Sequence, residues 1–391
     1  MEKFDVLVVG AGPAGSTTSY RLACAGARVL LVDRARFPRD KPCGGGLTMR
    51  AVRLLPFSVE PVVEDRASDF TFGLDFDHRF ERRAKAPLVL LTQRSRLDEF
   101  LAGQAAEAGA DFRDGTRVSD LEVTADAAEA TVGSSRVQAH ALIAADGANG
   151  TTARAAGIDD DRDYGVALEG NVPHDALDPE TYRGRLFLEL GVVPGGYGWV
   201  FPKGDHVNVG VGGWAREAPT LRGHLSRFCR EYGLDEGRLE SVRGFRLPLI
   251  KPKTELARGR VALVGDAAGL VDPLSGDGIY EAFLSGRLAA EATLDLLEGR
   301  AANLEPYAHV VRRSLASQLA AAWGAKMALD RFPRLTYTAI RSPYVWKAVE
   351  SLMGGEVPSP GAMRGFRRAS LKVIAGIARA AGNPGKAFAE T

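Results

Sequence analysis

A glycine-rich turn between a short apolar strand and a helix limits the fold of this chain more than any other feature of its sequence. The β-branched run at residues 4–9, Phe-Asp-Val-Leu-Val-Val, predicts a buried parallel strand, and a GxGxxG motif follows it at once. In this motif Gly10 permits a tight turn, Gly12 lets the backbone approach a pyrophosphate, and Gly15 lets the next helix pack closely on the sheet. We expect that helix to begin near Ala14, with its positive end facing a phosphate group.

A second strand and an acidic residue complete the unit that such a turn requires. Residues 28–32, Arg-Val-Leu-Leu-Val, form another apolar run, which ends at Asp33. An acidic side chain at this distance from the glycines accepts hydrogen bonds from a ribose 2′-hydroxyl. A lone GxGxxG is a weak signal, but strand, helix, second strand and terminal acid in this order predict a dinucleotide-binding site.

Length, charge and cysteine content narrow the class of protein. The 391 residues exceed the ~100–200 of one ordinary domain, so two or three folding units are expected. Lys and Arg number 50 against 49 Asp and Glu, which leaves no field for binding nucleic acid. Cys24, Cys43 and Cys229 form neither a disulfide framework nor a zinc motif, so we expect no metal and a reducing, cytoplasmic setting. No run of ~18 apolar residues predicts a membrane span, so any membrane contact would be peripheral, on the inner face of the cell membrane.

Two later strand-to-turn segments indicate which dinucleotide is bound. Residues 141–150, Ala-Leu-Ile-Ala-Ala-Asp-Gly-Ala-Asn-Gly, resemble the second fingerprint of the flavoprotein monooxygenase superfamily, and residues 260–268 resemble the third. In the third fingerprint of that superfamily an aspartate, here Asp266, binds the ribityl chain of the flavin. Each Asp-Gly or Gly-Asp pair alone is an ordinary turn. Three fingerprints in the right order imply FAD as the cofactor.

Further positions match flavin contacts of the same superfamily. The turn after Asp266 reaches Gly278 and Ile279, where a helical pattern begins. Its backbone N–H groups and positive helix end would meet the electron-rich N1–C2=O edge of the flavin. Arg94 matches the arginine of an Arg-x-x-(Leu/Phe)-Asp segment that opens a helix next to the cofactor. We add Val118 to the expected cofactor-binding positions.

Two motifs narrow the resemblance to one family. Residues 41–48, Lys-Pro-Cys-Gly-Gly-Gly-Leu-Thr, and residues 196–203, Gly-Tyr-Gly-Trp-Val-Phe-Pro-Lys, closely resemble the Pro-Cys-Gly-Gly and YxWxFP motifs of the geranylgeranyl reductase family. The resemblance extends over about three quarters of the chain and weakens toward the C-terminus. In the first motif the expected cofactor-binding positions are Cys43, Gly44 and Gly46. The small glycines would let the backbone approach the isoalloxazine ring, with the Cys43 thiol pointing at the ring or the substrate.

The aromatic residues of the second motif recur at every second position. A strand would therefore present Tyr197, Trp199 and Phe201 on one face. By itself this pattern is more typical of a sheet core. Together with the motif match it indicates the wall of a slot for a flat isoprene unit. Halogenases of the superfamily carry two tryptophans and an isoleucine here, and its hydroxylases lack the Pro-Cys-Gly-Gly pattern, so both chemistries are less favoured.

The family resemblance implies a reductase that transfers a hydride from N5 of reduced FAD to a C=C bond of a polyprenyl substrate, either a lipid or a prenyl diphosphate. Because the chain has one GxGxxG, electrons would come from NAD(P)H visiting the flavin site or from a small redox protein. Cys43 and Tyr197 are candidate proton donors or positioning groups, and Trp199 joins them as a candidate catalytic residue. The alternatives are an aromatic or polyketide monooxygenase, and a flavin-binding redox or lipid-carrier protein without catalysis. No motif identifies the substrate headgroup.

The strand patterns predict an α/β plus antiparallel β architecture. It would combine a Rossmann-like FAD-binding domain, an antiparallel-sheet substrate domain that roofs the flavin, and C-terminal helices. We expect the FAD-binding domain at residues 1–65, 88–163 and 255–300, the substrate domain at residues 66–87 and 164–254, and the helical region at residues 301–391.

Two basic segments are candidates for contact with a charged partner. Residues 78–85 are expected to form a solvated loop, with a docking patch for a phosphate headgroup as the alternative. Residues 362–381 project as an amphipathic helix that can lie in a membrane interface or pack on the protein, and the sequence does not choose between the two. The apolar side of this helix holds Phe366, Val373, Ile374, Ile377 and Ala381, and the basic side holds Arg364, Arg367, Arg368, Lys372 and Arg379.

Overall fold

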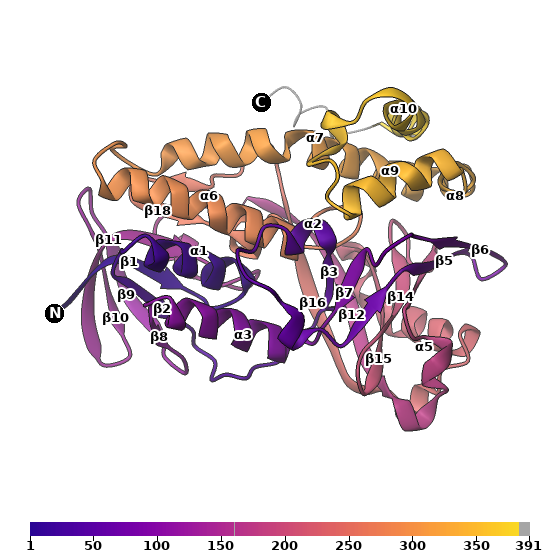
Figure 1. Ribbon diagram of the computed structural model, residues 1–391, viewed down its shortest axis with the longest axis horizontal. Coiled ribbons are helices and arrows are strands. Elements are labelled where there is room, and N and C mark those ends of the chain that lie inside the picture. Colours follow the sequence, from indigo (N-terminus) through magenta and orange to yellow (C-terminus); the bar gives the residue numbers. More distant parts are fainter. Residues whose placement is uncertain (160, 383–391) are drawn as a thin grey trace.

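The computed structural model describes residues 1–159 and 161–382, and it confirms the predicted α/β plus antiparallel β class (Figure 1). The first large sheet has the order β17-β18-β11-β1-β2-β8, with β10 and β9 attached to β11. Its strands are β1 (Glu2–Val9), β2 (Val29–Val32), β8 (Asp111–Arg113), β9 (Val118–Val123), β10 (Ala128–Val132), β11 (Ser135–Ala144), β17 (Ala257–Arg258) and β18 (Val261–Leu263).

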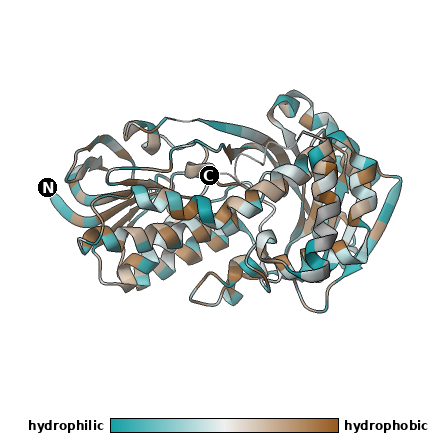
Figure 2. Cartoon of the chain, turned by 90° about the horizontal axis from the view of Figure 1, so that it is seen from above, coloured by the Kyte–Doolittle hydropathy of each residue, from teal (hydrophilic) through white to brown (hydrophobic). Residues whose placement is uncertain are grey.

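The parallel centre of this sheet forms because its strands are apolar on both faces. Val6, Leu7 and Val8 of β1 are fully buried between β2 and β11, with which β1 pairs in parallel. Helix α1 (Pro13–Cys24) packs against α3 (Arg94–Glu107) and α6 (Ile279–Leu297). In Figure 2 the helices seen from above carry brown and teal residues in alternation, as expected for helices with one face in the core.

The second large sheet has the order β16-β12-β15-β14-β13-β5-β6. All its pairs are antiparallel except β13 with β5, which run in parallel. One of its faces is covered by α5 (Leu221–Glu231), whose Phe228 is fully buried. The strands are β5 (Asp69–Leu74), β6 (His78–Arg83), β12 (Arg162–Pro173), β13 (Arg185–Leu190), β14 (Tyr197–Pro202), β15 (His206–Trp214) and β16 (Glu240–Ile250).

Short elements connect the two sheets. A three-stranded sheet joins β3 (Gly46–Thr48), β7 (Val89–Leu91) and β4 (Asp65–Ala67), and short helices are α2 (Met49–Val52) and α4 (Thr152–Ala155). Single 3-10 turns occur at Glu60–Val62, His174–Ala176, Pro179–Thr181, Ala215–Thr220, Glu236–Arg238, Gly265–Ala268 and Pro360–Ala362. The expected division into three domains stays a prediction, and β4 lies across its boundary between residues 65 and 66.

Four helices form the C-terminal part, and Figure 1 shows the last three gathered at one end of it. They are α7 (Glu305–Arg331), α8 (Pro333–Ile340), α9 (Pro343–Met353) and α10 (Gly365–Ala380). Ile377, Ala378 and Ala381 of the last segment are buried, and the first two form a cluster with Ala328 of α7, against which Phe332 packs. This part of the amphipathic helix therefore packs on the protein, while its Phe366, Val373 and Lys372 side chains lie outside the described ones.

The basic segment at residues 78–85 is not the solvated loop that we expected. Most of it is strand β6, which pairs with β5 at the end of the second sheet. Arg83 donates two hydrogen bonds to Asp69, and the Arg79 guanidinium lies 4.0 Å from the buried Glu189. The charges of the segment had hidden its strand pattern, and part of them pair across the sheet, since Arg79 and Arg83 lie next to acids and Glu81 lies 3.3 Å from Arg185.

Among the described residues, no helix combines the length and the apolar character that crossing a bilayer requires.

Candidate functional site

The turn between β1 and α1 has the geometry that close approach of a phosphate requires. Gly10 has a φ of +105°, and a methyl group on it would lie 2.3 Å from the carbonyl oxygen of Ala145. A methyl group on Gly15 would lie 1.9 Å from the carbonyl oxygen of Gly10. Neither position has room for a side chain. Helix α1 begins at Pro13, and Ala14 is buried beneath the turn.

Asp33 ends β2 and holds the glycine turn against the following loop. Its Oδ2 accepts a hydrogen bond from the Ala11 N–H at 2.9 Å, and its Oδ1 accepts one from the Ala35 N–H at 2.9 Å. Arg39 lies 3.6 Å from the Asp33 carboxylate, and its guanidinium also borders Gly12. Sequence reasoning missed Arg39, since no motif marks it.

Arg94 is the first residue of α3 and is 5% exposed. It donates two hydrogen bonds to Asp98, one helical turn away, at 2.8 and 2.7 Å. The guanidinium of Arg39 lies 3.0 Å from the same carboxylate. Arg39 thus bridges the carboxylates of Asp33 and Asp98, and both arginines offer N–H donors beside the glycine turn, where they suit an anionic phosphate.

Asp266 lies at the end of β18 and pairs with Lys41, a second cation that the sequence did not single out. The two side chains are 2.8 Å apart, and Arg162 donates to the backbone carbonyl oxygens of Asp266 and Ala267 at 2.9 Å each. Burial alone would raise the pKa of Asp266, but the neighbouring cations, Lys41 first among them, outweigh burial and hold the pKa below its usual value. Asp266 is therefore an ionised acceptor, suited to hydroxyl groups.

The start of α6 lies next to Asp266. A methyl group on Gly278 would lie 3.1 Å from Asp266 Oδ1, so the fold brings these two predicted positions together. The Ile279 N–H donates to Asp277 Oδ1 at 2.9 Å, which means that this N–H already has a partner within the chain. The Asp277 carboxylate therefore lies at the positive end of α6, which we expected to face the flavin.

Cys43 lies on a loop that is held by its backbone on both sides of the segment Cys43–Gly44. The Cys43 N–H donates to Glu169 Oε1 at 2.6 Å, and the Gly44 carbonyl accepts a hydrogen bond from Lys203 Nζ. The next residue, Gly45, has a φ of +64° and donates its N–H to Cys43 Sγ at 3.4 Å. Glu169 and Lys203 are each 5% exposed. Lys203 directly follows the aromatic motif, whereas Glu169 carries no sequence signal that distinguishes it from a surface residue.

The aromatic residues of β14 share one face, as predicted. The rings of Tyr197 and Trp199 are 6.0 Å apart, and a methyl group on Gly44 would lie 2.8 Å from the Phe201 ring and 3.5 Å from Trp199 Nε1. The aromatic face of the second sheet therefore packs against the Cys43 loop. A methyl group on Gly210 of β15 would lie 2.1 Å from the Trp199 indole, so only glycine leaves room for that ring.

Two remaining predicted positions have mainly structural surroundings. Val118 begins β9, shortly after Thr116, whose N–H donates to the Asp33 carbonyl at 2.9 Å. Asp146 of the second fingerprint accepts hydrogen bonds from the Thr151 and Thr152 N–H groups at 2.8 and 2.9 Å, and so stabilises its own turn.

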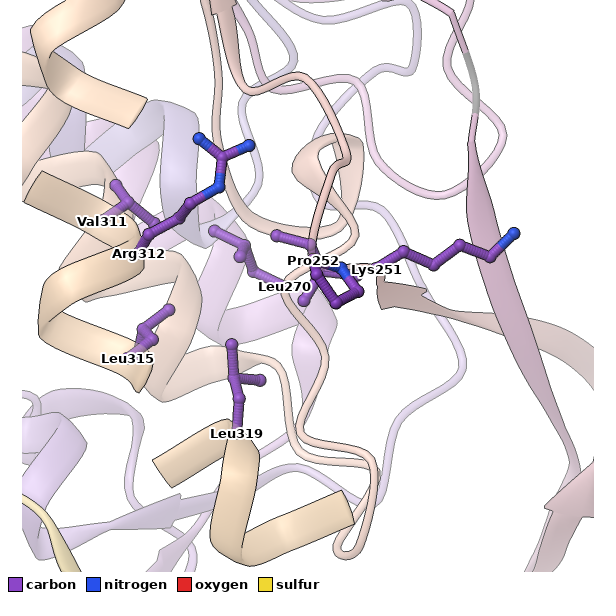
Figure 3. Close-up of a pocket in the computed structure, with 8 residues that line it drawn as sticks. Lys251, Pro252, Leu270, Val311, Arg312, Leu315 and Leu319 are labelled. Carbon is purple, nitrogen blue, oxygen red and sulfur yellow. The ribbon is translucent and has the colours of Figure 1, made fainter. Parts of the chain in front are cut away.

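None of these residues lines the small pocket shown in Figure 3. Its volume is about 10 Å³, far below the ~300–1,000 Å³ typical of ligand sites. In Figure 3 the Lys251 side chain extends away from the apolar lining. We assign no ligand to this pocket, which is lined by Ile250, Lys251, Pro252, Leu270, Val311, Arg312, Leu315 and Leu319.

The side chains around the glycine turn fit a flavin dinucleotide. Gly10 and Gly15 leave no side chain at the turn, Asp33 and the paired arginines flank it, and Asp266 lies next to the start of α6. A group that presents a ribose, two phosphates and a ribityl chain in this order would meet an acid, a positive helix end with two arginines, and a second acid. The residues present therefore match the chemistry of FAD.

Asp33→Ala should weaken FAD binding by about 1.5–3 kcal/mol, or roughly 10- to 150-fold, because the variant loses hydrogen bonds to a charged acceptor. The variant also loses the hydrogen bonds from the Ala11 and Ala35 N–H groups, which should loosen the turn and weaken FAD binding further. Titration of the FAD-free protein with FAD, followed by flavin fluorescence, measures the change. An unchanged affinity would place the ribose at another residue.

Comparison with known proteins agrees with this geometry. Residues 3–207, more than half of the chain, match the FAD binding domain family. The menaquinone reductase of Mycolicibacterium smegmatis is 37% identical over 311 residues, which cover 73% of this chain and 75% of that protein. The geranylgeranyl diphosphate reductase of Rhodobacter capsulatus is 33% identical over 319 residues, covering 78% of each chain.

A solved structure extends the likeness to the whole chain. The geranylgeranyl bacteriochlorophyll reductase-like protein of Thermoplasma acidophilum has a TM-score of 0.79 and 26% identity, with 96% of each chain covered. The predicted cofactor and family are thus confirmed by the family match, the relatives and the shared fold together. This chain belongs to the geranylgeranyl reductase family of FAD-dependent oxidoreductases.

Proposed function

We propose that this protein saturates isolated C=C bonds of an isoprenoid chain. The observation that carries the proposal is the packing of the Cys43 loop against the aromatic face of β14, where Gly44 lies against the Phe201 and Trp199 rings and Gly46 lies near Phe201. Relatives named for reduction of geranylgeranyl diphosphate and of menaquinone support the same substrate class. These compounds share the isoprene unit and differ in the headgroup.

The residues of the site are suited to aligning an alkene with the flavin more than to polarising its double bond. Reduced FAD, when bound, supplies the hydride for this chemistry. An isolated alkene offers no carbonyl group to polarise, so the protein must hold it in line and exclude water. Gly44 and Gly46 let the loop lie close to the Phe201 ring, so Trp199 and Phe201 fix the position of the loop. The Trp199 indole is itself fixed, because its Nε1–H donates to Asn208 Oδ1 at 2.8 Å.

The second hydrogen arrives as a proton, and the geometry favours Cys43 over Tyr197 as its source. The Tyr197 hydroxyl donates its hydrogen bond to the backbone carbonyl of Ser275, and burial raises the pKa of the phenol well above its usual value. The Cys43 thiol accepts one long contact from the Gly45 N–H and keeps its own proton available. We therefore assign proton delivery to Cys43 and a positioning role to Tyr197.

An anaerobic turnover experiment tests the function. The protein, reduced by dithionite so that no natural donor is needed, is mixed with geranylgeranyl diphosphate, an ether-linked geranylgeranyl lipid or a menaquinone. We expect reoxidation of the flavin, with a gain of two hydrogens per bond measured by mass spectrometry. Reoxidation by oxygen alone, with a hydroxylated product, would identify a monooxygenase. Tight lipid binding without turnover under any donor would identify a carrier.

The C-terminal helices form the surface that we propose for contact with an anionic membrane. Residues 331–382 contain nine Lys and Arg against two Asp and Glu, although the whole chain is nearly neutral. Leu335 of α8 and Tyr344 of α9 are 55% and 59% exposed, which is unusual for such large side chains. An open hollow of about 490 Å³ at the start of α10 is lined by apolar residues together with Arg364 and Arg367. Because the apolar side of α10 is buried in part, the contact would be electrostatic, with few inserted side chains.

Reversing two charges of this surface should weaken membrane binding. Each basic residue near an anionic surface contributes about 1 kcal/mol, so Arg364→Glu with Arg368→Glu should lower the affinity for phosphatidylserine vesicles by roughly 30-fold or more. The matched control is Arg222→Glu with Arg230→Glu, which changes the same charge at exposed sites on α5. Vesicle sedimentation at low and high salt measures binding. An equal loss of vesicle binding in both variants would mean that the net charge of the protein determines binding, and that the position of the charges on α10 does not matter.

A further inference from the structure

We propose that Glu169 and Lys203 act as a charged clamp that positions the two-residue segment Cys43–Gly44 for the reaction; as a statement about catalysis, this rests on the proposed function. The clamp holds the segment at the peptide before Cys43 and at the peptide after Gly44. The Glu169 carboxylate accepts the Cys43 N–H at 2.6 Å, and the Lys203 ammonium donates to the Gly44 carbonyl. Each bond is charge-assisted, since an anion meets an N–H and a cation meets a carbonyl oxygen. Both roles are positioning roles, because neither side chain needs to touch a substrate.

The sheet register explains how a carboxylate reaches this place. Glu169 of β12 lies opposite Gly210 of β15, which in turn lies opposite Trp199 of β14. Gly210 has no side chain, so the Trp199 indole lies over it in the same row across the sheet as Glu169. In the adjacent row Asn208 receives the Trp199 N–H. The row thus joins the clamp to the aromatic wall, and both face the Cys43 loop.

The carboxylate is not accounted for by ordinary packing. Glu169 is 5% exposed, and its Oε2 has no hydrogen-bond partner among the described residues. Leaving a buried carboxylate oxygen unpaired costs folding free energy, so a purely structural role would be served better by a neutral amide. A positioning role, in contrast, needs the charge.

The same sheet provides a matched comparison on its other face. Glu189 of β13 is fully buried, but both of its oxygens have partners, the Phe76 N–H at 2.8 Å and the Tyr232 hydroxyl at 2.7 Å. It lies opposite Gly198, whose added methyl group would meet Phe228 of α5, so it faces away from the Cys43 loop. Glu189→Gln therefore removes a buried carboxylate without affecting the clamp.

The two ends of the clamp titrate close to neutral pH. Burial raises the pKa of Glu169 to about 7, partly offset by the Cys43 N–H and by Lys203, and burial lowers the pKa of Lys203 to about 8. Below about 7 the carboxyl is neutral, and above about 8 the amine is neutral, so both charges are present only between these values. The charged and titratable groups around the pair are Asp40 and the Cys43 thiol on the loop, Glu64 and Asp65 near Lys203, and His206 on β15.

A pH profile of alkene reduction tests the clamp in the FAD-loaded protein. Wild type should show a bell-shaped profile with limbs near 7 and 8. Glu169→Gln should lose the acidic limb and fall roughly tenfold at the optimum, since a charge-assisted bond becomes a neutral one. Lys203→Arg keeps its charge at all these pH values, and so should lose the alkaline limb. Glu189→Gln should keep both limbs.

Hydrogen exchange of the Cys43 amide gives a readout that does not depend on turnover. At pH 7.5 this amide should exchange at least about tenfold faster in Glu169→Gln than in Glu189→Gln, measured by mass spectrometry with residue-resolving fragmentation. Equal exchange in the two variants, or FAD lost from Glu169→Gln alone, would overturn the clamp. If the Cys43 amide exchanges as expected but the protein reduces no alkene, the proposed function is rejected while the clamp stands.

Discussion

Gly15→Ala should purify without bound FAD. The new methyl group would lie 1.9 Å from the Gly10 carbonyl oxygen, a backbone atom that cannot move without opening the turn. Overpacking of this kind costs about 1–3 kcal/mol, and we expect the upper end because no flexible side chain can yield. The displaced turn would also lose the N–H groups and the helix end that face the phosphates. We expect FAD affinity to fall by at least about 100-fold, measured by the flavin absorbance of the purified protein and by titration with FAD.

Gly103→Ala is the matched control for this variant. Gly103 lies inside α3, and a methyl group there would meet nothing within 4 Å. Alanine has the higher helix propensity, so this variant should be more stable by roughly 0.4–1 kcal/mol and should retain FAD. Both variants make the same chemical change within a helix, so the contrast isolates the contact with Gly10. Normal FAD content in Gly15→Ala would show that the turn can relax, and that α1 does not pack as tightly as described.

Cys43→Ala should keep FAD but reduce alkenes at least about 100-fold more slowly. The loop is held by Glu169 and Lys203 through its backbone, so the thiol is not needed for its position. Removal of a group that transfers a proton in the transition state typically costs 10²–10⁴ in rate. Single-turnover reoxidation of the reduced, FAD-loaded variant by a geranylgeranyl substrate measures the change, and flavin absorbance reports the FAD content.

Cys24→Ala serves as the control, because Cys24 is an exposed thiol on α1. Cys43→Ser separates proton donation from packing: a hydroxyl keeps the size and a transferable proton, so part of the rate should return. An unchanged rate in Cys43→Ala would move proton delivery to Tyr197. Release of FAD from the variant would instead mean that the thiol positions the cofactor.

The cofactor-binding unit could be predicted from the sequence because its signals are local. The glycine spacing, the two apolar runs and the acid at Asp33 all lie within the first 33 residues, and each has a fixed structural meaning. The shared face of Tyr197, Trp199 and Phe201 followed from the period of a strand for the same reason. Lys41 and Arg39 were not predicted although they lie shortly after Asp33 in the sequence. The sequence alone does not distinguish a basic residue of a site from a basic residue of the surface.

The sequence by itself determined that this chain forms a dinucleotide fold with a second sheet and a loop of small residues around one thiol. It could not place α10, because an apolar helix face buries as readily against helices as against lipid. Nor could it find the clamp: Glu169 and Lys203 lie 126 and 159 residues away from their partners in the Cys43 loop. Only the pairing of β12, β15 and β14 decides which side chains share a row, and only the missing side chain of Gly210 lets the Trp199 indole lie across that row. Strand register is a property of the assembled sheet, so the tertiary structure alone could make these residues part of one site.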